Sequence, residues 1–196
     1  RELFKMYQLD SAIECGGAYF QGHCGHNLYW YFDTQGTERP VLFIHSINAA
    51  PSAIELKPLF THFKSSRSVF APDLPGFGRS TRNIGHFTPK DFAREIAAMM
   101  EAIPGDEPPD VIALSLGCEF VARAITDFGA RARSLTFISP SGFSARKPPS
   151  QKAQKRLKGV LNFAGLGRNA FKLLRTERSI RYFYGMNFSG FVPNEL

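Results

Sequence analysis

The stretch DVIALSLGCEF, residues 110–120, decides the fold because two periodic patterns meet at one of its residues. Residues 110–115 form a short apolar run, which is typical of a strand buried on both faces. Residues 117–128 instead have the spacing of an amphipathic helix, with Gly129 just past its end. Ser115 is therefore predicted to lie on a sharp turn between a strand and a helix. Such a turn lifts the hydroxyl above the sheet, so we interpret Ser115 as a nucleophile.

The residues two before and two after this serine should be small, because the backbones of neighbouring elements pass closely there. Gly117 meets the second requirement. Ala113 occupies the first position, where glycine is commoner, and it adds only one methyl group. We therefore expect the turn to form with alanine at 113.

Other apolar runs and helical patterns alternate along the chain in the same rhythm. Predicted strands cover 27–34, 40–45, 67–73 and 134–139. A predicted helix is capped by Thr88, has Pro89 in its first turn and runs to Ile103. This alternation predicts an α/β fold, a mostly parallel sheet with helices on both faces. Ligands of such sheets bind beyond the carboxyl ends of the strands.

The segment VLFIHSINAAPS, residues 41–52, ends a strand at His45 and continues as a loop of small residues. His45, Ser46 and Asn48 are expected to line the space above the nucleophile. The backbone N–H groups of Ile47 and Leu116 are the expected pair of donors to an oxyanion. The alternative is an ordinary loop in which His45 only hydrogen-bonds the backbone.

Asp73, in APDLPGFGRS at 71–80, follows another strand. Its compact surroundings of proline and glycine predict that its carboxylate holds the turn by accepting backbone N–H groups. The competing interpretation is that Asp73 is the acid of a catalytic triad.

Four segments, taken together, resemble the α/β-hydrolase fold in their order and spacing. They are PVLFIHS (40–46), APDLPGFGRS (71–80), ALSLGCEF (113–120) and LTFISPSGF (135–143), and the resemblance covers residues 27–143. It implies that Ser115 is the nucleophile and that the N–H groups of Ile47 and Leu116 form the oxyanion hole. Serine rather than aspartate at 115 argues against the epoxide hydrolases and haloalkane dehalogenases of this fold. The family usually has His-Gly where this chain has His45-Ser46.

The same resemblance implies a division at residue 143. Residues 1–143 match the N-terminal part of the hydrolase core, which is incomplete, and residues 144–196 match a partial helical cap. In this fold the triad acid and histidine follow the nucleophile. All five histidines of this chain precede Ser115. We therefore expect the catalytic histidine and acid to lie beyond Leu196, in a chain truncated within its cap.

These features predict a serine hydrolase that acts on an ester-like or other carbonyl substrate. Esterase, lipase and carbon–carbon bond hydrolase activities use the same residues and stay open. The phenylalanines of the expected cap favour a small apolar acyl or aromatic substrate. The alternative hypothesis is a catalytically inactive relative that binds a ligand or depends on a partner.

The charge and the cysteine content of the chain limit which partners and which cellular compartment are expected. The chain has 24 Lys/Arg and 17 Asp/Glu, and residues 144–196 hold 11 of the basic but 2 of the acidic side chains. This basic segment permits contact with an anionic membrane surface, but a solvated helical face is favoured. No nucleic-acid motif accompanies it, so no nucleic-acid partner is expected. Three cysteines without a disulfide framework, and no signal peptide, predict a cytoplasmic protein.

The segment CGGAYFQGHCGH, residues 15–26, is the one candidate for a metal site. Cys15, His23, Cys24 and His26 are potential ligands, but their spacing does not match a zinc motif. We interpret the segment as a glycine-rich turn between outer strands, and expect neither a metal nor a cofactor. Cys118 is interpreted as a small core residue.

Overall fold

The computed structural model describes residues 10–48, 51–141 and scattered positions between 150 and 182. The chain divides into two units, residues 1–144 and 145–196. The first unit contains all the strands described below. Most of the predicted cap, 144–196, lies outside the described residues.

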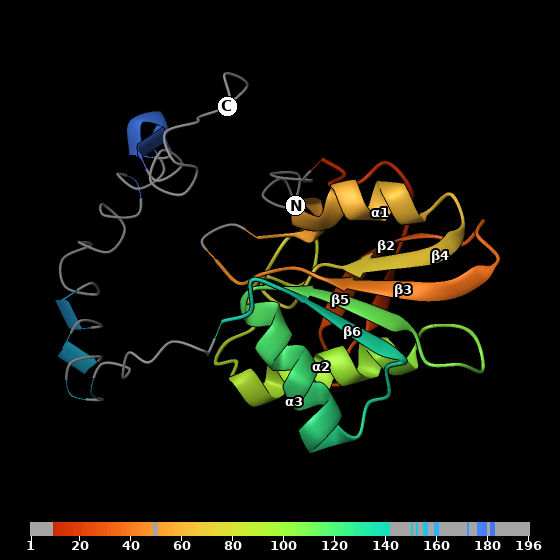
Figure 1. The fold of residues 1–196 in the computed structure, drawn as a ribbon. Helices are drawn as coiled ribbons and strands as arrows, with labels where there is room; N and C mark the ends of the chain where they lie inside the picture. Colours follow the sequence, from red (N-terminus) through yellow and green to blue (C-terminus); the bar gives the residue numbers. More distant parts are fainter. Residues whose placement is uncertain are drawn as a thin grey trace, which may run out of the picture. The chain divides into compact units, whose positions relative to one another are not determined.

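A six-stranded sheet forms the centre of the first unit (Figure 1). Its strands are β1 (Gly16–Gln21), β2 (Asn27–Asp33), β3 (Glu38–Ile44), β4 (Arg67–Pro72), β5 (Asp110–Leu114) and β6 (Ser134–Ile138). Their order in the sheet is β1-β2-β4-β3-β5-β6. The pairs β4·β3, β3·β5 and β5·β6 are parallel, whereas β1·β2 and β2·β4 are antiparallel. The predicted, mostly parallel sheet is thereby confirmed.

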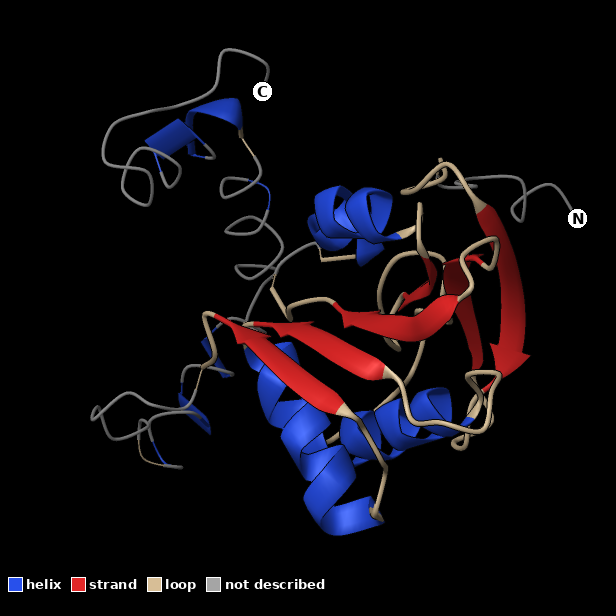
Figure 2. Cartoon of the chain, turned by 45° about the vertical axis from the view of Figure 1, so that its right-hand side comes forward, coloured by secondary structure: helices blue, strands red, loops and turns tan. Residues whose placement is uncertain are grey.

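Helices cover both faces of this sheet (Figure 2). The short 3₁₀ helix η2 (Ala53–Leu56) and helix α1 (Lys57–Phe63) lie on one face, and α2 (Pro89–Glu101) and α3 (Leu116–Phe128) lie on the other. Thr88 and Asp91 form a reciprocal capping box at the start of α2. Gly129 ends α3 with φ of 70°, as its sequence position predicts.

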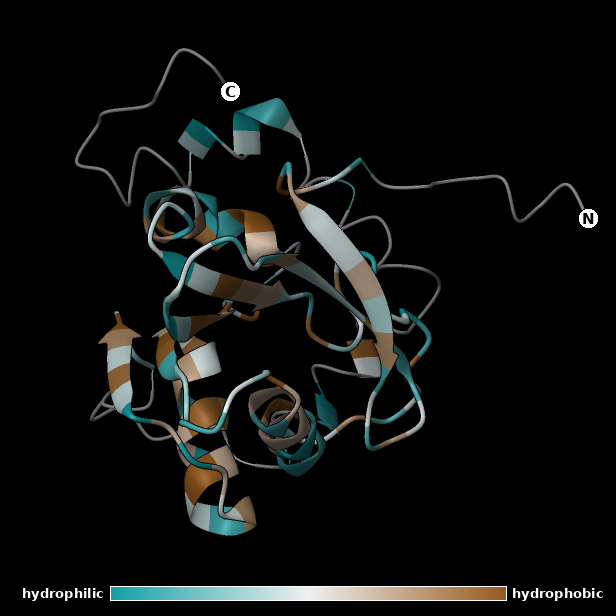
Figure 3. Ribbon diagram, turned by 90° about the vertical axis from the view of Figure 1, so that its right-hand side faces the viewer, coloured by the Kyte–Doolittle hydropathy of each residue, from teal (hydrophilic) through white to brown (hydrophobic). Residues whose placement is uncertain are grey.

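Two apolar clusters fill the space between the sheet and the helices. Alternate residues of β5 divide between them: Val111 and Ala113 face α2 and α3, whereas Ile112 faces α1. Phe92 of α2 stacks on Phe120 of α3 with ring centroids 5.0 Å apart. Figure 3 shows the hydrophobic positions of strands and helices alternating with hydrophilic ones. Strand β5 is thus buried on both faces, which places the turn that follows it at a fixed point.

The glycine-rich stretch 15–26 differs from its interpretation as a turn. Its first half is strand β1, which pairs with β2 from Gly16 opposite Phe32 to Gln21 opposite Asn27. Only residues 22–26 form the turn, closed by the Gly22 N–H donating to the His26 carbonyl at 2.8 Å. A Cβ at Gly17 would overlap the hydroxyl end of the Tyr29 side chain, so glycine leaves room for this ring inside the strand.

Candidate active site

Ser115 occupies the turn between β5 and α3 in a backbone conformation that L-residues rarely adopt. Its φ of 53° and ψ of −120° lie outside the helical and strand regions. Three hydrogen bonds hold this geometry. The Ser115 N–H donates to the Ile138 carbonyl at 2.9 Å, and the Ser115 carbonyl accepts from the N–H groups of Cys118 at 3.1 Å and Ser141 at 3.4 Å. The half-buried Ser115 hydroxyl has no hydrogen-bond partner among the described residues.

The close approach at Gly117 involves the end of β3. A Cβ at this position would lie 2.5 Å from the His45 carbonyl oxygen and 3.1 Å from the Ile44 side chain. Real Cβ atoms do not tolerate the first distance, so glycine brings the start of α3 against the end of β3. Ala113, in contrast, is fully buried within β5, and its carbonyl accepts a hydrogen bond from the Cys118 thiol at 3.2 Å. The methyl group of alanine is accommodated there.

His45 is fully buried, and the backbone engages both nitrogens of its ring. Its Nε2 accepts from the Leu74 N–H at 2.9 Å, which makes Nδ1 the protonated nitrogen. Nδ1–H donates to the Ser46 carbonyl at 2.6 Å. Burial lowers the pKa of His45 below its ordinary value of 6.5, so the ring is neutral at physiological pH. This histidine holds the loop after β3 and has no nitrogen available to take a proton from Ser115.

Two backbone N–H groups at the carboxyl edge of the sheet have no acceptor among the described residues. One belongs to Ile47, in the loop that follows β3, and the other to Leu116, the first residue of α3. The first N–H groups of a helix have no partner within the helix. The apolar side chains of both residues pack against the core cluster beneath α2 and α3. Both donors therefore lie where the contact at Gly117 brings the end of β3 and the start of α3 together.

Ser46 and Asn48 share a partner that the sequence did not indicate. Ser46 is almost fully buried and Asn48 is exposed. Both hydrogen-bond the carboxylate of Glu55, on η2. No sequence motif identifies Glu55 as the partner, because Ser46 and Asn48 lie nine and seven residues before it, across a loop. The only signal in the sequence was the serine at position 46, where the family usually has glycine.

Asp73 holds the turn after β4, as its surroundings predict. Its fully buried carboxylate accepts from the N–H groups of Ala53 and Arg79, each at 2.9 Å. Gly78 lies so close that a Cβ there would overlap this carboxylate. Asp73 thus ties η2 to the β4 turn, and both oxygens have structural roles.

The described residues contain no group of three His, Cys, Asp or Glu side chains arranged to hold a metal ion. The N–H groups of His23 and Cys24 instead donate to the buried carboxylate of Glu95 at 2.8 and 2.7 Å. Burial, together with Glu95, raises the pKa of the Cys24 thiol to about 11. Cys118 is buried in the core, as expected.

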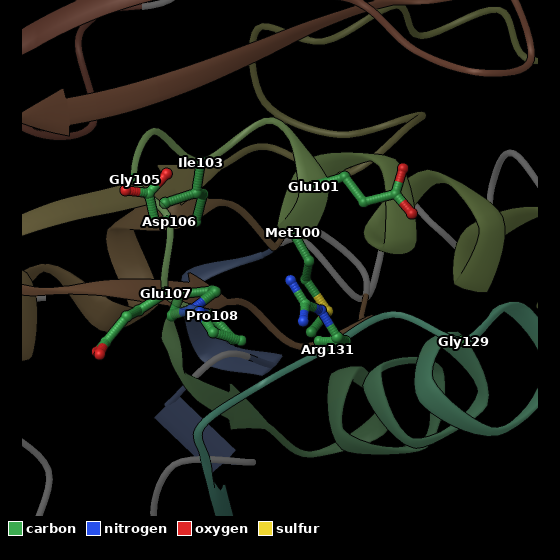
Figure 4. A pocket seen from close by; sticks show the side chains of 10 residues that line it. Met100, Glu101, Ile103, Gly105, Asp106, Glu107, Pro108, Gly129 and Arg131 are labelled. Carbon is green, nitrogen blue, oxygen red and sulfur yellow. The ribbon is translucent and has the colours of Figure 1, made fainter.

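A pocket of about 220 Å³ lies at the opposite edge of the sheet (Figure 4). It is lined by residues near the end of α2, before β5 and after α3: Met100, Glu101, Ile103, Gly105, Asp106, Glu107, Pro108, Pro109, Gly129 and Arg131. These residues adjoin the amino end of β5, whereas Ser115 follows its carboxyl end. This pocket is therefore separate from the serine. In the part of the chain that the structure describes, no helix is both long and apolar enough to cross a bilayer.

The strained serine turn, set on this sheet order, defines an α/β-hydrolase-type core. The chain belongs to the alpha/beta hydrolase fold family, whose model matches residues 39–186. No curated protein is similar in sequence at a significant level.

Solved structures of this fold resemble the chain at low sequence identity. One is a serine hydrolase involved in carbazole degradation, with 15% identity and a TM-score of 0.60, covering 91% of this chain and 73% of its own. An alpha/beta hydrolase fold protein from Burkholderia ambifaria has 20% identity and a TM-score of 0.62, and the match covers 84% of this chain and 57% of that protein. A hydrolase from Pseudomonas aeruginosa PA01 has 17% identity and a TM-score of 0.63, and the match covers 81% of this chain and 58% of that protein. The chain thus spans between 57% and 73% of the length of these three proteins.

Proposed function

We propose that the whole protein is a serine hydrolase with Ser115 as its nucleophile. The observation that carries this proposal is the conformation of Ser115, whose strained turn leaves the hydroxyl without a partner among the described residues. Strain of this kind persists where the surrounding structure enforces it, and it gathers at functional sites. The Ile47 and Leu116 N–H groups, which lack acceptors in the same described part of the chain, are the proposed oxyanion hole.

The proposed reaction is acyl transfer in two steps. The Ser115 oxygen attacks the substrate carbonyl as its proton passes to a general base, and the two N–H groups stabilise the negative charge on the carbonyl oxygen. Collapse of this intermediate expels the leaving group, which takes the proton from the base. Water then attacks the acyl-serine by the same route and restores the hydroxyl.

The general base is proposed to be a histidine in sequence beyond Leu196, oriented by an acid there. His45 is a poor candidate because both of its ring nitrogens are engaged and its pKa is lowered by burial. The proposed substrate is a small ester-like or other carbonyl compound with an apolar acyl or aromatic group. One structural relative of the chain is a serine hydrolase of carbazole degradation, which is consistent with an aromatic substrate.

Covalent labelling of the full-length protein tests this proposal. A fluorophosphonate probe is expected to label the protein, and Ser115→Ala should abolish the labelling because the nucleophile is lost. Ser141→Ala is the matched control, since it removes an exposed hydroxyl nearby while its backbone N–H remains. Undiminished labelling of Ser115→Ala would refute the assignment. A folded wild-type protein that never reacts would favour a catalytically inactive binding module.

A further inference from the structure

Glu55 holds the loop after β3 through three donors. Its Oε2 accepts from the Ser46 N–H at 2.9 Å, and its Oε1 accepts from the Ser46 hydroxyl at 2.8 Å and from the Asn48 side-chain amide at 2.6 Å. The same amide also donates to the Ser46 hydroxyl at 2.8 Å. Hydrogen bonds to an ionised carboxylate are stronger than those between neutral groups. Glu55 therefore closes a compact polar ring on the loop.

The two peptide units beside the Ser46 Cα are both fixed by this arrangement. The N–H of one donates to Glu55, and the carbonyl of the other accepts from His45 Nδ1. This second carbonyl shares a planar peptide with the Ile47 N–H, which points in the opposite direction. Rotation about the backbone bonds of Ser46 is thus restrained from both sides, and the direction of the Ile47 N–H is set.

Glu55 is itself held firmly. The 3₁₀ helix η2 is capped by the Ser52 hydroxyl, which accepts from the Ile54 N–H at 3.3 Å. The Ala53 N–H donates to buried Asp73, and the side chains of Ala53 and Leu56 are buried on either side of Glu55 in sequence. The carboxylate therefore acts from a rigid support, as accurate alignment of a donor requires.

We propose that Glu55 is a positioning residue that aims the Ile47 N–H at the oxyanion formed on a Ser115-bound substrate. This inference rests on the proposed function, because it gives the Ile47 N–H its catalytic meaning. It also explains why serine is favourable at 46, where the family usually has glycine: the Ser46 hydroxyl supplies one of the three donors to Glu55. Ser46 and Glu55 act as a pair that stiffens the loop.

Steady-state kinetics of an activated ester with the full-length protein test this role. In Glu55→Ala, kcat should fall about tenfold while KM changes by less than about twofold, because an aligned donor acts mainly in the transition state. Glu55→Gln retains one acceptor oxygen and should recover part of the loss. Ser46→Ala removes one of the three donors and should lie between Glu55→Ala and the wild type. Glu101→Gln, at the exposed end of α2, is the control and should match the wild type.

Hydrogen exchange supplies a readout that does not depend on catalysis. Amides of residues 44–48 should exchange faster in Glu55→Ala, whereas those of β5 should not change.

An unchanged kcat in Glu55→Ala would overturn the inference, and so would a loss of kcat explained fully by a smaller folded fraction. If Ser115→Ala retains the full turnover, the proposed function fails, and the role of Glu55 in catalysis fails with it. Loss of turnover in Ser115→Ala with an unaffected Glu55→Ala would refute the role of Glu55 alone.

Discussion

His45 illustrates how the environment of a single residue determines its role. The sequence places it at the end of a strand, among the residues expected to line the space above the nucleophile. Its burial and its bonds to Leu74 and Ser46 make it a neutral support for the loop instead. Protonation of Nε2 would break the bond from the Leu74 N–H, because that nitrogen would no longer accept.

The lowered pKa of His45 predicts a pH dependence of stability. In the unfolded chain His45 takes up a proton as the pH falls through its ordinary pKa of 6.5, whereas the native residue stays neutral until a lower pH. The unfolded state then binds more protons, so the free energy of unfolding should decrease as the pH falls below about 6.5. Urea denaturation at a series of pH values measures this decrease.

His45→Asn should lose part of this pH dependence, and His62→Asn, at an exposed position, should retain it. An NMR titration of the wild-type ring gives a second measurement if His45→Asn does not fold. A His45 ring that titrates near pH 6.5 in the native protein would contradict the prediction.

At the scale of elements, the site depends on the contact between the end of β3 and the start of α3. This contact places the loop with Ile47 beside Leu116 at the start of α3, and Gly117 permits it. Gly117→Ala should destabilise the protein by about 1–3 kcal/mol, because the new methyl group meets the His45 carbonyl. It should also remove most of the fluorophosphonate labelling.

Ala113→Gly is the matched substitution on the other side of the serine. Its cost should be about 0.5–1 kcal/mol, from the greater freedom of glycine in a strand, and labelling should be nearly intact. Denaturation curves and probe labelling of the two variants measure both effects. Equal losses in the two variants would show that the β3–α3 contact has no special role.

At the scale of the whole molecule, the β6 edge of the sheet exposes apolar side chains in the described part of the chain. Strand β6 pairs with β5, and Leu135 and Phe137 on it are 44% and 36% exposed. An uncovered apolar edge strand favours association with other chains. The 196-residue chain should therefore associate as its concentration rises.

Light scattering or size-exclusion chromatography over a range of concentrations measures this association. Leu135→Lys should reduce it, because a charge on an edge strand opposes pairing. Ile54→Lys changes an apolar residue that is 52% exposed and lies away from β6, and it should leave the association unchanged. A chain that stays monomeric at every concentration would contradict the prediction.

Much of the fold could be predicted from local patterns. The apolar runs at 40–45 and 110–115, the cap at Thr88 and the stop at Gly129 each depend on neighbours a few residues away. Strand β1 was missed because its glycines oppose strand formation locally. They suit side chains that β2 places across the strand pair: a Cβ at Gly16 would lie 3.1 Å from Phe32, and one at Gly17 would overlap the end of the Tyr29 side chain.

The sequence by itself determined the α/β alternation, the turn at Ser115 and the bond of Asp73 within its own turn, because each depends on spacing along the chain. Only the tertiary structure decided the order of the strands, the neutral state of His45 and the hydrogen bonds by which Glu55 holds the loop after β3. Leu74 donates to His45 across 29 residues, and Glu55 reaches Ser46 across nine. Hydrogen bonds between residues so separated form only after packing has removed competing water, so no local pattern records them.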